Sequence, residues 1–290
     1  MTVLAKPAFR PLKGIRILSL ALNLPGPAAL MRCQQMGARC VKLEPPRGDP
    51  MLIYCKPAYT ALHQNIRITS ADLKTEAGQK TLHRELAKAD VLLTSFRPSA
   101  LVKLGLTWKA LHQQYPQLSQ IAIVGSLGVL AEAPGHDLTY LAANGLVTSL
   151  DLPATLYADM GGSLMASEAV LQAALHKRTS GNGIYLEVAL SNSASYLALP
   201  RVWGLTTPGA AVGGGHAGYQ IYSCKNGRVA VAALEPHFAA RLCAAAGLGA
   251  PDMKLLATRQ AIAAWLLGKT RAQLEKLAVD RDIPLHTLER

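Results

Sequence analysis

A histidine and an aspartate stand side by side in APGHDLTY, residues 133–140. The apolar residues of this segment follow neither a helical nor a strand period, so we expect a loop. Histidine titrates near neutral pH and can take a proton as a base or give one as an acid, which makes His136 a candidate for proton transfer. Taken alone, however, the pair is more typical of a polar turn that Asp137 caps.

Alternating strands and helices in the first 125 residues indicate the scaffold behind this loop. Residues 14–20 and 39–44 are typical of strands, and residues 27–37 between them have helical apolar spacing closed by a glycine. Further strands are expected within NIRITSADL, ADVLLTS and SQIAIVG, with a helix at 76–88. This alternation predicts an α/β fold, in which helices cover the faces of a Rossmann-like parallel sheet.

A second, smaller α+β domain is expected after the glycine-rich segment TTPGAAVGGGHAG. It begins with a two-stranded hairpin whose turn is Asn226-Gly227, and helices follow near 237–247, 257–267 and 270–278. The expected domains are therefore a large α/β domain at 1–185, a linker helix with the glycine-rich boundary at 186–212, and the small domain at 213–290.

The charge of the chain favours an anionic ligand. Thirty Lys and Arg residues against 18 Asp and Glu give a formal net charge of +12, which attracts nucleic acids, phosphates, nucleotide cofactors or acidic membranes. The basic residues are scattered, without the aromatic and basic runs of nucleic-acid modules, so nucleic acid is not the expected partner. The five cysteines include no Cys-x-x-Cys pair, which predicts neither a disulfide framework nor a metal site and suits a reducing cytoplasm.

The N-terminal segment is not expected to be a secretion signal. The first 43 residues contain no Asp or Glu, but Pro25-Gly26-Pro27 interrupts their apolar run. No segment approaches the roughly 20 apolar residues that a membrane-spanning helix needs, so no membrane partner is expected.

Glu44 ends the second predicted strand, as does the acid that binds the ribose in dinucleotide-binding folds. The segment Leu22–Pro27 offers one glycine, whereas that fingerprint needs three at fixed spacing to admit the pyrophosphate. The sequence therefore disfavours an NAD-dependent enzyme.

Eight segments, taken in order, resemble the family III CoA transferase superfamily and in particular its alpha-methylacyl-CoA racemase branch. They are PLKGIRIL, PGPAALMRCQQMGARCVKLEPPRGDP, ADLKTEAGQ, ADVLLTSFRPSALVKLGL, PGHDLTYLAANG, ADMGGSLMASEAVLQAAL, SGNGIYLEVAL and GGGHAGYQIYSCKNGRVAVAALEPHF. The resemblance implies a CoA-binding large domain, a CoA thioester as substrate without a prosthetic group, and a homodimer of two interlocked ring-like chains. It starts near Pro11, so no cleaved targeting segment is expected.

The resemblance also implies residues that hold CoA. The arginine of the family's FRP segment contacts the phosphate portion of CoA, and here it is Arg97. The segment after the second strand offers Lys42 and Arg47, although many relatives carry an arginine where this chain has Pro45. Tyr140 matches the family's loop.

For catalysis the resemblance implies His136, Asp159 and Glu235. His136 and Asp159 would move protons on opposite faces of the α-carbon of a 2-methylacyl-CoA, because inversion requires an acid–base group on each side. The backbone N–H of Asp137 would stabilise the enolate oxygen, and Glu235 would orient the imidazole of His136. Asp159 lies at a predicted helix start, where the helix dipole favours the ionised form.

Two alternatives stay open. In the transferase branch the aspartate at the position of Asp159 attacks the thioester, and a non-catalytic CoA-binding homologue is also compatible with the sequence. Thr155 and Ala158 replace the usual Asn and Gly before Asp159, and the methyl group of Ala158 is expected to narrow the pocket or shift the backbone. The chain also ends before the segment that returns to the large domain in most relatives, so the interlock of the dimer stays open.

Overall fold

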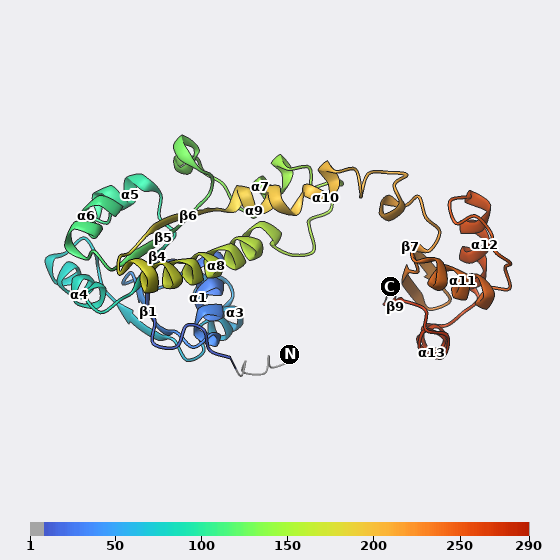
Figure 1. Ribbon diagram of the computed structural model, residues 1–290, viewed down its shortest axis with the longest axis horizontal. Helices are drawn as coiled ribbons and strands as arrows, with labels where there is room; N and C mark the ends of the chain where they lie inside the picture. Colours follow the sequence, from blue (N-terminus) through green and yellow to red (C-terminus); the bar gives the residue numbers. More distant parts are fainter. Residues whose placement is uncertain (1–8, 290) are drawn as a thin grey trace. The chain divides into compact units, whose positions relative to one another are not determined.

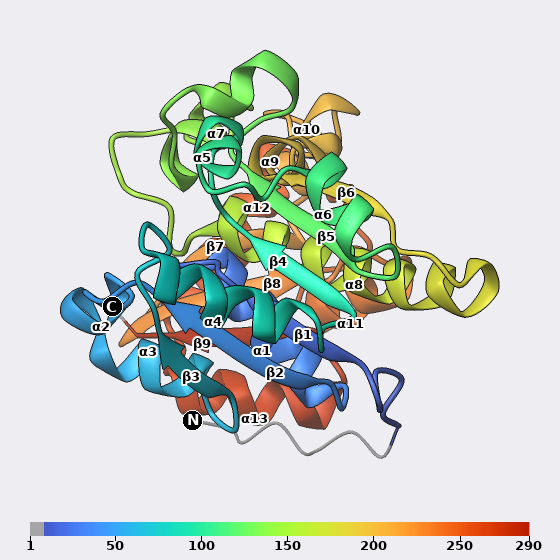
Figure 2. The same cartoon turned by 90° about the vertical axis from the view of Figure 1, so that its left-hand side faces the viewer.

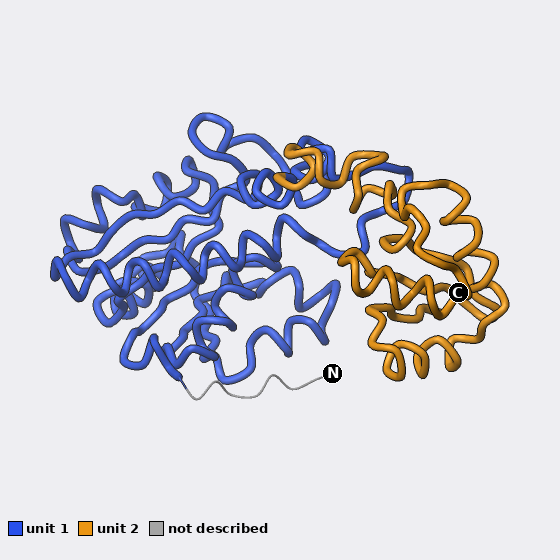
Figure 3. The backbone as a smooth tube through the Cα atoms, turned by 45° about the vertical axis from the view of Figure 1, so that its right-hand side comes forward, with its two compact units in different colours: residues 1–198 blue, residues 199–290 orange. Residues whose placement is uncertain are grey.

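The computed structural model describes residues 9–289. Residues up to Ala198 pack into one compact unit and those from Leu199 onward into a second, as coloured in Figure 3. Both contain helices and strands, which are labelled in Figure 1.

A six-stranded sheet forms the centre of the first unit, with the strand order β3-β2-β1-β4-β5-β6 and every neighbouring pair parallel. The strands are β1 (Arg16–Ser19), β2 (Arg39–Glu44), β3 (Arg67–Ser70), β4 (Val91–Thr94), β5 (Ser119–Val124) and β6 (Tyr185–Ala189). This confirms the predicted α/β fold with a parallel sheet. The boundary expected after residue 185 falls inside β6, which pairs with β5 and so stays with the sheet.

Helices cover both faces of this sheet (Figure 2). The faces differ because successive strand residues point to opposite sides: Ile17 packs with α1 (Pro25–Gln35) and α8 (Tyr157–Ser180), and its neighbour Leu18 packs with helices of the other face. The helices of that other face are α4 (Glu76–Leu86), α5 (Pro98–Lys103) and α6 (Trp108–Gln114). All residues of β4 and β5 are buried, as expected for strands covered on two sides.

The order of the strands reverses between β1 and β4, which are neighbours in the sheet. The chain leaves β1 toward β2 and leaves β4 toward β5, so the connections after these two strands diverge. Open α/β sheets bind their ligands at the carboxyl ends of strands at such a reversal. The residues that follow β1 and β4 are therefore the first place to look for a site.

The helix α8 brings small residues to the packed face. Ala158, Gly162 and Ala166 recur every four residues and are buried, and a Cβ at Gly162 would lie 2.3 Å from the side chain of Leu190. The helix ends at Gly181, whose φ of +76° is a left-handed cap. Within residues 9–289, no helix is long and apolar enough to cross a membrane.

Short elements complete the first unit. They are α2 (Met51–Tyr54), α3 (Lys56–Leu62), the 3-10 turn η1 (Gly128–Glu132), α7 (Asp137–Ala143) and α9 (Leu190–Leu197).

The second unit has a three-stranded antiparallel sheet in the order β7-β8-β9 and an apolar core shared with its helices. Its elements are α10 (Leu199–Val202), η2 (Ala211–Gly213), β7 (Tyr219–Cys224), β8 (Gly227–Ala232), α11 (Pro236–Ala245), α12 (Leu256–Leu267), α13 (Arg271–Arg281) and β9 (Leu285–Leu288). The hairpin is present, but Gly227 pairs with Cys224, so its turn is Lys225-Asn226 and not Asn226-Gly227. Gly227 is needed because a Cβ there would lie 2.4 Å from the carbonyl oxygen of Leu288 in β9, a strand that the sequence did not predict.

The start of α1 lacks the features of a dinucleotide-binding turn. Pro25 and Pro27 provide no N–H groups at the first turn of the helix. The lone glycine, Gly26, packs its backbone against Ala21, and a Cβ at Gly26 would lie 2.2 Å from the Cβ of Ala21. This glycine therefore serves the packing of α1 against the preceding loop.

Replacing Gly26 with alanine should lower the free energy of unfolding by about 2 to 3 kcal/mol, because two methyl groups would compete for one space. The second change Ala21→Gly removes the opposing Cβ and should restore part of this loss. Chemical denaturation of the wild type, both single variants and the double variant measures the coupling. Equal and additive losses in both single variants would contradict the proposed contact.

Candidate active site

His136 stands directly before α7 and is exposed. Its backbone is extended, and its N–H and carbonyl both bond to the hydroxyl of Thr139, at 3.1 and 2.7 Å. The polar turn expected from the sequence is thus the start of a helix. The imidazole projects from a backbone that the first turn of α7 fixes.

Asp137 connects the start of α7 with the start of α8. Its side chain is buried, with 4% of the residue exposed, and Oδ1 accepts the backbone N–H of Asp159 at 3.0 Å. One carboxylate therefore fixes the position of the other acid, 22 residues further along the chain. The backbone N–H of Asp137 lies in the first turn of α7, where helical N–H groups have no partner within the helix.

Asp159 lies in the first turn of α8 and is partly buried. Burial raises the pKa of its carboxyl group to about 6, the negative charge of Asp137 adds to the rise, and His136 opposes it. Burial thus outweighs the expected effect of the helix dipole. His136, Asp137 and Asp159 form one electrostatic group in which Asp159 is mostly ionised at pH 7.

Arg97, after β4, provides an exposed positive charge at the strand reversal. Burial and the charge of Asp159 raise the pKa of Tyr140, whereas Arg97 lowers it, so Tyr140 lies within electrostatic reach of both Asp159 and Arg97. A Cβ at Gly125 or Gly135 would lie 2.4 or 2.5 Å from the Tyr140 hydroxyl, so both glycines make room for this side chain.

The two predicted basic residues near β2 differ in their surroundings. Arg47 is exposed and forms no ion pair with a described residue. Lys42 is fully buried, and its ammonium group is paired with Asp49 and with Glu44. Lys42 thus presents no charge at the surface, where a CoA phosphate would bind, and CoA contact by Arg97 and Arg47 stays a prediction.

Glu235 belongs to the second unit, where it is exposed and directly precedes α11. An acid directly before the first turn of a helix is also a common helix-initiating residue. The pairing of Glu235 with His136 stays a prediction.

The two substitutions before Asp159 lie in different environments. Ala158 is fully buried, and its methyl group belongs to a small core with Leu141 and Ala194. It therefore fills the space between α7, α8 and α9, which differs from the expected narrowing of a pocket. Thr155 is exposed.

Sequence reasoning missed Tyr54 and Asp49. Burial, Asp49 and Asp159 together raise the pKa of Tyr54, so the exposed end of α2 lies within electrostatic reach of Asp159. Asp49 is completely buried. The signal available in the sequence was the GDP segment at 48–50, in which an acid follows a glycine and precedes a proline, a common way to start a helix.

Asp159→Asn should stabilise the first unit at pH 8 by about 1 to 2 kcal/mol, after allowance for partial solvent exposure. The pKa of Asp159 is raised from 3.8 to about 6, so the folded state binds an extra proton between these values and gains stability as the pH falls from 6 to 4. The advantage of the variant should therefore disappear near pH 4. Denaturant unfolding at several pH values tests this, and an advantage that does not change with pH would contradict it.

Comparisons with known proteins identify the family of the chain. The model of CoA-transferase family III matches residues 12–290. Cinnamoyl-CoA:phenyllactate CoA-transferase of Clostridium sporogenes is 34% identical over 63% of this chain and 50% of its own length. Alpha-methylacyl-CoA racemase of Mus musculus is 29% identical over 83% of this chain and 66% of its own length. The chain thus spans half to two thirds of the length of these relatives.

The solved structure of a CAIB/BAIF family protein from Brucella suis has the same fold. Its TM-score is 0.82 at 23% identity, and the match covers 97% of this chain and 85% of that chain. Together with the family match over residues 12–290, this leads to one assignment: the chain belongs to CoA-transferase family III.

Proposed function

We propose that this chain acts on 2-methylacyl-CoA thioesters and inverts their α-carbon by proton transfer between two acid–base groups. The observation that carries the proposal is the joint placement of His136 and Asp159 at two adjoining helix starts, which the carboxylate of Asp137 holds together. A pKa of about 6 suits Asp159 for giving and taking a proton near neutral pH.

The two groups share one proton before and after the reaction. In one direction the neutral imidazole of His136 removes the α-proton, and protonated Asp159 delivers its proton to the opposite face of the enolate. The reverse direction starts from the imidazolium and the Asp159 carboxylate. Both starting states hold the same number of protons, so both hands of the substrate meet an active enzyme at the same pH.

The enolate oxygen that forms between these steps needs hydrogen-bond donors already in place. The backbone N–H of Asp137 suits this role, because it lies in the first turn of α7 next to the base. We assign Glu235 the orientation of the His136 imidazole, as the resemblance implies.

The CoA part of the substrate would be held by positive charge at the carboxyl edge of the sheet. Arg97 is exposed at the strand reversal, and Arg47 is exposed beyond the end of β2. Tyr140 lies within the electrostatic reach of Arg97. We propose no prosthetic group, a homodimer as the working state, and a cytoplasmic location.

Transfer of CoA between carboxylic acids is the second candidate, since several relatives are named as CoA-transferases. In this route the Asp159 carboxylate attacks the thioester carbonyl, and the CoA thiolate leaves as a mixed anhydride forms. The thiolate then attacks the aspartyl carbonyl, which releases the first acid and yields an enzyme–CoA thioester. This route gives His136 no proton to move at the α-carbon, which is why we place it second.

Deuterium incorporation decides between the candidates. With a 2-methylacyl-CoA in deuterated water and no acceptor acid, the wild type should label and invert the α-carbon, because the abstracted proton exchanges with solvent. Inversion should fall about 10²- to 10⁴-fold in His136→Ala and in Asp159→Ala. Nuclear magnetic resonance of the α-carbon and chiral analysis of the product measure both.

His176→Ala is the matched control, because His176 lies on α8 but near the opposite end from Asp159. It should keep wild-type exchange. Absence of label, together with CoA transfer to an added carboxylate that requires Asp159 but not His136, would replace the racemase with the transferase. CoA binding without either reaction would indicate a non-catalytic homologue.

A further inference from the structure

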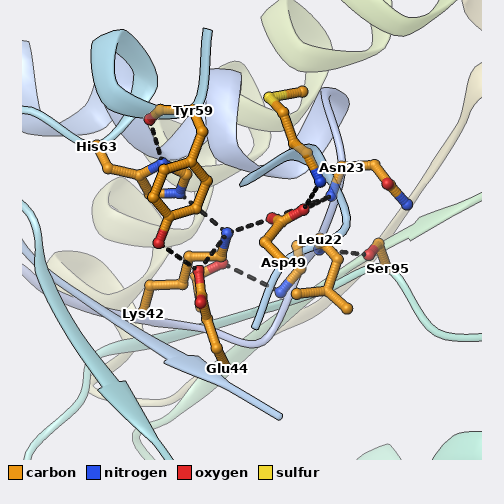
Figure 4. Close-up of polar contacts among 11 residues, drawn as sticks. Leu22, Asn23, Lys42, Glu44, Asp49, Tyr59, His63 and Ser95 are labelled. Atoms are coloured by element: carbon orange, nitrogen blue, oxygen red, sulfur yellow. Dashed lines mark hydrogen bonds and ion pairs between the residues drawn. The ribbon is translucent and has the colours of Figure 1, made fainter. Parts of the chain in front are cut away.

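We infer that Lys42 and Asp49 are positioning residues for the proposed CoA site: Lys42 holds Asp49, and Asp49 holds the loop between β1 and α1. The inference rests on the proposed function, in which CoA binds at the carboxyl ends of β1 and β4. Figure 4 shows the buried polar network that these residues form with Glu44, Tyr59 and His63.

The ammonium group of Lys42 has three polar partners. It hydrogen-bonds to Asp49 Oδ2 and to His63 Nε2 at 2.9 Å, and it forms an ion pair with Glu44 Oε1 at 3.1 Å. The side chains of Lys42 and Asp49 are fully buried, and that of Glu44 is 6% exposed. The ammonium group is therefore enclosed by its partners and not exposed to a ligand, and withdrawing it would leave buried acids without a counter-charge.

His63 accepts a hydrogen bond from Lys42. Its Nδ1 lies 2.6 Å from the carbonyl oxygen of Tyr59, which can only accept, so Nδ1 carries the hydrogen. Nε2 therefore has a free electron pair, which points at the ammonium group of Lys42. Burial lowers the pKa of His63, which agrees with a neutral ring.

Glu44, Asp49 and His63 would suit a metal ion by type and spacing. The ammonium group of Lys42 already contacts all three, through two hydrogen bonds and one ion pair, so it occupies the place that an ion would take. The structure therefore points to a lysine-centred network with a positioning role.

Asp49 connects the network to the loop that follows β1 through hydrogen bonds with the backbone. Its Oδ1 accepts the backbone N–H of Asn23 at 3.1 Å and that of Met51, at the start of α2, at 2.9 Å. Its Oδ2 also lies 3.2 Å from the Asn23 nitrogen. Asn23 has a φ of +64°, a left-handed conformation that asparagine adopts more readily than most residues, and the two contacts from Asp49 hold it there.

The loop is also connected to the residue that we assign to the CoA phosphates. The backbone N–H of Leu22 bonds to the Ser95 hydroxyl oxygen at 3.1 Å, and Ser95 lies two residues before Arg97. A continuous series of contacts thus runs from Lys42 through Asp49, Asn23 and Leu22 to the segment that carries Arg97. Loss of the Asp49 acceptor should increase the mobility of the segments that follow β1 and β4.

Two double variants separate positioning by Lys42 from direct contact with CoA. Lys42→Met with Asp49→Asn removes both charges but keeps an oxygen that accepts from Asn23 and Met51. Lys42→Met with Asp49→Leu removes both charges and the acceptor, with a side chain of similar size. The readouts are the Kd of CoA by calorimetry and the amide hydrogen exchange of residues 20–24 without ligand.

The first double variant should bind CoA within about threefold of the wild type, whereas the second should bind about tenfold more weakly and exchange faster at residues 20–24. Arg97→Ala should weaken CoA binding without faster exchange. Lys88→Ala, which removes an exposed charge just before the amino end of β4, should change neither readout.

Equal loss of CoA affinity in both double variants, with unchanged exchange, would make Lys42 a direct ligand and overturn the inference. Wild-type affinity and exchange in both would overturn it as well. If either double variant fails to fold, Ser95→Ala tests the same series of contacts and should speed exchange at Leu22; unchanged exchange would overturn it. A wild type that does not bind CoA would refute the proposed function, while the exchange rates still report on positioning.

Discussion

The arrangement of the candidate site depends on one hydrogen bond, from the backbone N–H of Asp159 to the buried carboxylate of Asp137. It joins the first turns of α7 and α8, although residues 144–156 separate the end of α7 from the start of α8. His136, directly before α7, and Asp159, in the first turn of α8, are thereby held in one electrostatic group. The small apolar core of Leu141, Ala158 and Ala194 packs α7 against α8 and α9, and this hydrogen bond adds a polar contact at the two helix starts themselves.

Two buried aspartates each fix a backbone segment by accepting its N–H, but they differ in their electrostatic effect. Asp49 and Asp137 each accept a backbone N–H from a segment at the carboxyl edge of the sheet. Asp49 has the ammonium of Lys42 as its counter-charge, which balances a carboxylate in the interior. Asp137 has no ion-pair partner among residues 9–289, and its charge therefore helps to raise the pKa of Asp159. Asp49 therefore only fixes the position of the backbone, whereas Asp137 also changes the pKa of a proposed acid–base group.

Much of the fold follows from local pattern, because the strands and helices of the first unit carry apolar periods that report which face is buried. The strand β9 was not predicted, since its four residues lack a clear period and it forms only by pairing with β8. In the site, the family resemblance indicated His136, Asp159 and Arg97, whereas the residues taken alone indicated only a polar turn at His136. The burial of Lys42 and of the Ala158 methyl group could not be predicted from the sequence, because both are covered by residues that are distant in the sequence.

The pH dependence of deuterium incorporation tests most directly whether His136 and Asp159 share one proton. We predict that kcat/KM for exchange rises near pH 6, passes through a maximum and falls again, with the same profile for both hands of a 2-methylacyl-CoA. A rate that rises near pH 6 and then stays level toward pH 9 would mean that only the ionised carboxylate of Asp159 is required. That result would contradict the two-base account.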